Sequence, residues 1–136
     1  MNLFKRTPKK LPQNSDRLLV NPEDMPNPQN VADYLRRGYA FYARSKFAEA
    51  EADFQQAIQI DSKAVDAYYA LGMAQKAQEH KEDSIRTFEK VINLIDSGAI
   101  ENQVRAHMLR RLAQGHINEL NEGDWNLEKE IWHRVE

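Results

Sequence analysis

Apolar residues recur every three or four positions along most of the chain after residue 30, which is the spacing of one face of an α-helix. This pattern predicts four helices, over residues 31–45, 47–60, 64–78 and 82–95. The apolar face of the second helix carries Phe47, Ala50, Phe54, Ala57 and Ile58. The matching face of the fourth carries Ile85, Phe88, Val91, Ile92 and Ile95.

The ends of these helices also have sequence signals. Asn30 is a suitable N-cap for the first helix, with Asp33 placed to favour its positive end. Ser62 is the cap candidate before the third helix. Gly98, in the stretch "DSG", is expected to end the fourth.

Similar residues return at a fixed offset of 34 positions, so residues 31–98 read as two copies of one unit. The matching pairs include Tyr34 and Tyr68, Gly38 and Gly72, Ala40 and Ala74, Phe54 and Phe88, and Ile58 and Ile92. Each copy contains two predicted helices. The sequence therefore predicts helical hairpins that stack on one another.

A glycine inside each first helix needs an explanation, because glycine costs a helix about 1 kcal/mol relative to alanine. Small residues are needed where the two helices of a hairpin cross closely, and an aromatic ring can then fill the remaining gap. The small residues expected at these crossings are Gly38, Ala50, Gly72 and Ser84. The expected rings are those of Phe54 and Phe88. The alternative is that the glycine forms a kink or hinge.

These residues resemble the tetratricopeptide repeat (TPR) family, whose unit is a helix–turn–helix of 34 residues. The resemblance is strong over residues 31–98 and weaker over 99–136. It implies an all-α fold, a short right-handed TPR solenoid of about three helical hairpins. The expected organisation is an extended arm over 1–29 and a TPR domain over 30–136, with repeats at about 31–64, 65–98 and 106–136.

The third repeat is less regular than the other two. Its first helix is recognised from Leu109, Leu112, Ala113 and His116, with Ala113 equivalent to Gly38 and Gly72. The inserted residues 99–105 would lengthen this helix towards its N-terminus. Its second helix is expected over 123–135, with Asp124 as N-cap. Other departures from the family are Arg37, where leucine is usual, and Ser62 and Asp96, where proline is usual between units.

Residues 1–29 differ in composition from the rest of the chain. All five prolines lie within the first 28 residues, and five basic against three acidic side chains make this arm net positive. Three alternatives are open for it. It is a tail without a specific role, it becomes ordered on a partner through the apolar residues 18–20 and the basic residues 5–10, or it folds back onto the repeats.

The resemblance implies that the first helices of the units line a concave surface that binds a segment of another protein. The residues expected to bind the partner are Leu35, Arg36, Tyr39, Tyr42, Tyr69, Met73, Lys76, His107, Arg110 and Gln114. Tyr39, Tyr42 and Tyr69 are the expected anchors, although one or two of them could pack between units instead. The family's carboxylate clamp is not expected, because its positions hold Leu35, Tyr39 and Ala70.

Composition narrows the function further. The net charge of −2 argues against a general nucleic-acid binder, and the absence of cysteine excludes disulfides and thiolate metal sites. No apolar run approaches the length of a membrane span, and we expect a cytoplasmic protein. No catalytic or phosphate-binding motif occurs, and His107 and His116 are not spaced as a metal pair, so we expect no enzyme activity, cofactor or metal.

The expected function is a non-catalytic protein–protein interaction module, an adaptor or assembly factor, that binds an extended or helical partner segment in its groove. One alternative is an integral structural subunit of a larger complex, held through its arm and outer surfaces. Another is a homo-oligomeric module that associates through Trp125 or Trp132 in the last predicted helix, where the opposing expectation is that both are buried.

Overall fold

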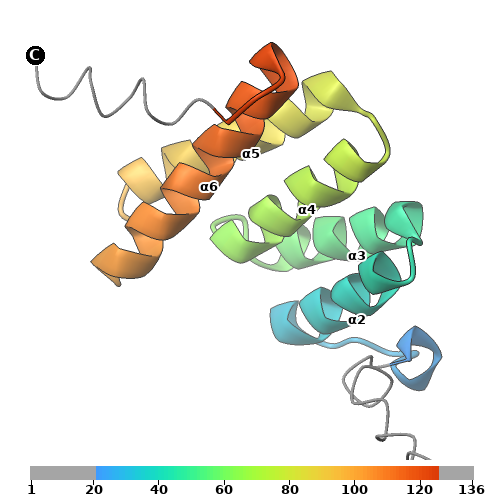
Figure 1. Ribbon diagram of the computed structural model, residues 1–136. Coiled ribbons are helices and arrows are strands. Elements are labelled where there is room, and N and C mark those ends of the chain that lie inside the picture. Colours follow the sequence, from blue (N-terminus) through green and yellow to red (C-terminus); the bar gives the residue numbers. More distant parts are fainter. Residues whose placement is uncertain (1–20, 126–136) are drawn as a thin grey trace, which may run out of the picture.

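The computed structural model describes residues 21–125, which contain five α-helices and one short 3₁₀ helix (Figure 1). The elements are η1 (Pro22–Asp24), α2 (Val31–Ala43), α3 (Phe47–Ile60), α4 (Val65–Ala77), α5 (Lys81–Asp96) and α6 (Gln103–Glu122). The four helices predicted over residues 31–95 are confirmed, each end to within two residues. The expected all-α fold is confirmed with them.

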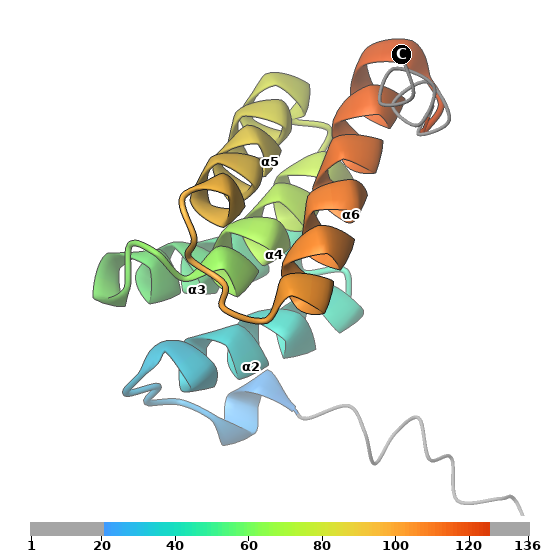
Figure 2. The same ribbon diagram turned by 90° about the vertical axis from the view of Figure 1, so that its left-hand side faces the viewer.

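Each helix packs mainly against the next one along the chain, so α2 with α3 and α4 with α5 form stacked hairpins, and α6 packs on α5 (Figure 2). The turns inside the two hairpins share one backbone shape. Ser45 and Glu79, which are 34 positions apart, adopt the left-handed conformation with φ of 58° and 62°. The structural repeat therefore includes the turns, although the residues at these two equivalent positions are of different types.

The glycines of the first helices lie directly under phenylalanine rings, as expected. A Cβ atom at Gly72 would lie 2.8 Å from Cε1 of Phe88, and one at Gly38 would lie 2.8 Å from Cδ1 of Phe54. Both rings are fully buried. The Ser84 hydroxyl also donates a hydrogen bond of 2.8 Å to the carbonyl oxygen of Gly72. The packing interpretation of these glycines is confirmed.

Replacing Gly72 with alanine is expected to lower the free energy of unfolding by about 1–3 kcal/mol, because the fully buried Phe88 ring must move. In an exposed helix the same change stabilises by about 1 kcal/mol. Urea denaturation measures the difference. As a control, Ala52→Gly at an exposed helix position measures the intrinsic difference in helix propensity between alanine and glycine. A gain in stability for Gly72→Ala would show that the close approach to Phe88 has no energetic consequence.

Two of the three expected helix-end signals are confirmed. The Asn30 side chain accepts a hydrogen bond of 2.9 Å from the backbone N–H of Asp33, and Gly98 follows α5 with φ of 89°. The prediction for Ser62 is wrong. The N-cap of α4 is Ala64, which makes no side-chain cap, because Asp61 instead shapes the preceding turn by accepting from the N–H of Lys63.

The inserted residues lengthen the first helix of the third unit towards its N-terminus, as expected. Helix α6 starts at Gln103, where Asn102 caps it by accepting from the N–H of Arg105 at 3.0 Å. It ends at Gly123, whose φ is 85°. The second helix expected over 123–135 has not begun by residue 125, and its remaining residues lie outside the described part of the chain.

Residues 21–29 lie against the first repeat. The Arg37 guanidinium reaches the carbonyl oxygens of Met25 and Pro26, at 3.2 and 3.4 Å, and Pro22 is buried. Of the three alternatives for the arm, residues 21–29 follow the one in which it folds back onto the repeats. Residues 1–20, which include the apolar stretch and the basic cluster, lie outside the described range.

Candidate functional site

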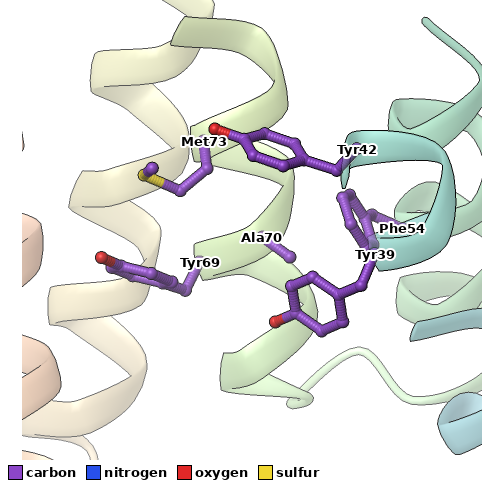
Figure 3. Close-up of a pocket in the computed structure, with 6 residues that line it drawn as sticks. All are labelled: Tyr39, Tyr42, Phe54, Tyr69, Ala70 and Met73. Carbon is purple, nitrogen blue, oxygen red and sulfur yellow. The ribbon is translucent and has the colours of Figure 1, made fainter. Parts of the chain in front are cut away.

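A wholly apolar pocket of ≈ 180 Å³ opens between α2 and α4 (Figure 3). Its walls come from three helices, with α3 supplying one ring. The lining residues are Tyr39, Tyr42, Phe54, Tyr69, Ala70 and Met73. Four of these six are residues that the sequence placed on the partner-binding surface.

Helix periodicity explains why these side chains meet. Tyr39 and Tyr42 lie one turn apart on α2, and Tyr69 and Met73 lie one turn apart on α4, so each pair shares one helix face. Ala70 lies between the two pairs (Figure 3). Because its side chain is a single methyl group, it leaves the space that forms the pocket.

The tyrosine rings of the pocket are held in place by other aromatic rings. Tyr39 packs edge-on against Phe54, with ring centroids 5.3 Å apart, and Tyr42 packs edge-on against Phe47 at 5.0 Å. Burial raises the pKa of the Tyr39 and Tyr69 hydroxyls above their usual value, and the carboxylate of Asp66 adds to the effect at Tyr39. Both phenols are therefore neutral at physiological pH. Since Tyr39 is also 48% exposed, it presents a fixed apolar face to solvent.

An ion pair joins α4 to α6 beside the pocket. Arg105 binds the carboxylate of Asp66, which is close enough to Tyr39 to influence its pKa. Sequence reasoning did not find Arg105, because it was assigned to the insertion before the third unit. The insertion was expected to lengthen the helix, but no contact with α4 was assigned to it.

Tyr69 also belongs to a polar network that joins α4 to α6. Its hydroxyl oxygen lies 3.0 Å from Nε2 of His116, while Nζ of Lys76 lies 3.0 Å from both Nδ1 of His116 and Oε2 of Glu119. An ammonium group can only donate, so Nδ1 accepts. The neutral imidazole therefore carries its proton on Nε2 and donates it to Tyr69.

Trp125 covers the outer side of this network. Its ring lies 4.8 Å from that of His116, and a Cβ at Gly115 would overlap it. Its carbonyl oxygen accepts a hydrogen bond of 2.7 Å from the Asn118 side chain. In this unit the glycine under an aromatic ring is therefore Gly115, whereas Ala113, the residue that the sequence matched to Gly38 and Gly72, is fully buried. Trp125 is 36% exposed, and Trp132 lies outside the described residues.

The other residues expected on the binding surface do not line the pocket. Leu35 packs on the core, Arg36 and His107 are exposed, and Gln114 bonds Asn118 on its own helix. Lys76 is engaged by His116 and Glu119. Arg110 pairs with Asp96 at the end of α5, which directs it towards the second helix of unit two. The structure therefore brings together Tyr39, Tyr42, Tyr69 and Met73 at the pocket. The other six expected residues lie outside its lining.

Over residues 21–125, no helix is long and apolar enough to cross a membrane. The same part of the chain holds no group of three or more histidine, aspartate or glutamate side chains placed to bind a metal ion.

Comparison with known families gives two overlapping matches. A family model described as TPR repeat matches residues 38–79, and one described as tetratricopeptide repeat matches residues 65–97. No curated protein and no solved structure gives a significant match.

Proposed function

Because residues 38–97 are tetratricopeptide repeats, which generally mediate protein–protein interaction, we propose that this chain is a non-catalytic interaction module. It acts as an adaptor or assembly factor in the cytoplasm. It binds a segment of a partner protein along the surface formed by its first helices, and the pocket between α2 and α4 is the main point of attachment.

The observation that carries this proposal is the apolar pocket with three tyrosines and a methionine around its opening. Tyrosine gives a large contact area at low entropic cost and is enriched among the residues that dominate binding energy. Methionine adapts to the shape of its partner. The tyrosine rings are fixed before binding by Phe54, Phe47 and Phe88, which reduces the entropy lost on association.

Replacing Tyr39 with alanine is expected to weaken binding of the partner segment about tenfold or more. Tyr39 is the most exposed aromatic residue of the pocket, so its loss disturbs the core less than the loss of the other rings would. The partner is first captured from native extract, its binding segment is mapped, and the synthetic segment is titrated by calorimetry.

Tyr68→Ala is the matched control. Tyr68 is a half-buried tyrosine on α4, whose hydroxyl donates to the carbonyl oxygen of Ser62 and which does not line the pocket. Its replacement should leave the affinity within about twofold. Equal affinity of wild-type protein and Tyr39→Ala for the mapped segment would move the binding site away from the pocket, and the N-terminal arm would become the next candidate.

A further inference from the structure

The equivalent phenylalanine rings of the two repeats, Phe54 and Phe88, have different aromatic neighbours. Phe88 has two aromatic neighbours: Tyr69 lies edge-on at 5.7 Å, and the imidazole of His116 is stacked on it at 4.8 Å with an interplanar angle of 16°. Phe54, which lies 34 positions earlier, has the edge-on neighbour Tyr39 at 5.3 Å. A stacked ring is thus present over Phe88 and has no counterpart over Phe54 among the described residues.

The place of the stacked ring in the second unit corresponds to the pocket of the first. His116 lies between Phe88 and Lys76, which are the repeat equivalents of Phe54 and Tyr42. Phe54 and Tyr42 both line the pocket. Helix α6 fills this place with an imidazole. On α4, the small residues Ala70 and Ala74 pack in the cluster around Phe54, and Met73 lines the pocket beside them.

We propose that the partner segment inserts one neutral, planar aromatic side chain into the pocket, over Phe54, in the place that His116 takes over Phe88. This inference rests on the proposed function and adds the chemistry of the ligand. The size of the pocket agrees with it. An apolar cavity of about 150 Å³ holds one benzene ring, and this pocket measures ≈ 180 Å³.

The surrounding charges favour a neutral side chain. The two charged pairs that lie near the pocket, Asp66 with Arg105 and Lys76 with Glu119, are each neutralised within the chain. The lining itself is apolar. A charged side chain would lose its hydration here without gaining a partner of opposite charge, while an aromatic ring gains edge and face contacts with the tyrosines. Binding should therefore depend little on salt concentration.

Small probes test the ligand class without knowledge of the partner. The protein is titrated with p-cresol, which reproduces a tyrosine side chain, with 3-methyl-1-butanol, which is branched and aliphatic, and with butylammonium. The methyl resonances of Ala70 and Met73 report occupancy by NMR. We expect saturable shifts with p-cresol, and binding about 2- to 10-fold weaker for the aliphatic alcohol and weaker still for the cation. Equal or stronger binding of either comparison probe overturns the proposal.

Two variants and one control locate the probe. Ala70→Leu should fill the pocket and abolish the p-cresol shift at Met73, whereas Ala77→Leu, at an exposed position at the end of the same helix, should not. Conversely, His116→Ala should open the equivalent place over Phe88 and bind a second molecule of p-cresol. Retention of p-cresol binding in Ala70→Leu, or failure of His116→Ala to gain a site, contradicts the equivalence on which the proposal stands.

The outcomes separate this inference from the proposed function. If a partner segment depends on Tyr39 but p-cresol does not bind, the groove is functional and the ligand is not aromatic. If p-cresol binds but no partner depends on Tyr39, the pocket accepts a ring and the proposed function fails.

Discussion

Replacing Arg37 with leucine, the residue usual at this position of the family, is expected to destabilise the fold by about 3 kcal/mol. Arg37 forms two hydrogen bonds with the carboxylate of Asp53, at 2.8 and 2.7 Å. The Asp53 side chain is only 5% exposed, so the substitution leaves a buried carboxylate without its partner, which costs about 3–5 kcal/mol. The lower value is expected because Arg37 itself is 22% exposed and water can partly replace it. Urea denaturation measures the change.

A double-mutant cycle distinguishes the buried pair from simple packing. Arg37→Leu/Asp53→Leu removes both charges, so it should recover most of the lost stability. Additive effects of the two single substitutions would contradict the account. Hydrogen exchange gives a second, local measurement. Arg37 also donates hydrogen bonds to the carbonyl oxygens of Met25 and Pro26. Arg37→Leu should therefore speed exchange of the Met25 amide, which is bonded to the carbonyl oxygen of Pro22. Arg37 thus joins Asp53 to the segment that precedes α2.

Acidification from pH 6.5 to 4 is expected to remove about 2–3 kcal/mol of stability through His116. Burial, and secondarily the positive charge of Lys76, lowers the pKa of His116 to about 4 from its usual 6.5. Between these two pH values the unfolded chain binds a proton that the folded chain does not. The free energy of unfolding therefore decreases as the pH is lowered through this window. Each pH unit inside this window corresponds to about 1.36 kcal/mol, and the loss is smaller towards both ends, where one state is only partly protonated.

The comparison of two histidine variants isolates this effect. His116→Gln can still accept from Lys76 and donate to Tyr69, but it does not titrate, so its stability should vary less between pH 6.5 and 4. His107→Gln alters an exposed histidine and should follow the wild type. Glu119, whose pKa is lowered by its hydrogen bond with Lys76, loses its contribution at lower pH and is present in both variants. Parallel curves for His116→Gln and the wild type would show that the ring is not held neutral.

The hairpins could be predicted from the sequence because their determinants are local or periodic. Apolar spacing located α2 to α5, and the 34-residue offset identified Gly38 and Gly72 as packing positions before any contact was known. The binding surface followed from the same periodicity, which is why Tyr39, Tyr42, Tyr69 and Met73 lie together. Their binding role remains a prediction.

The features that the sequence did not reveal depend on tertiary contacts. Arg37 was recognised only as a departure from the family, since its partner Asp53 lies on another helix. His116 was recognised only by its helical spacing, and its bonds to Tyr69 and Lys76 join residues 47 and 40 positions apart. The pocket itself is a consequence of Ala70 and has no sequence signal, because an alanine in a helix usually indicates close packing.

Cross-linking from the pocket tests the central claim most directly. Methionine is replaced throughout by a photoreactive analogue, and the protein is irradiated in native extract. Mass spectrometry then assigns each cross-linked peptide to Met73 in the pocket, to half-buried Met25 or to exposed Met108. The account predicts one partner segment joined at Met73, with an aromatic residue close to the cross-linked position. Partner peptides joined at Met108 or Met25 and none at Met73 would contradict it.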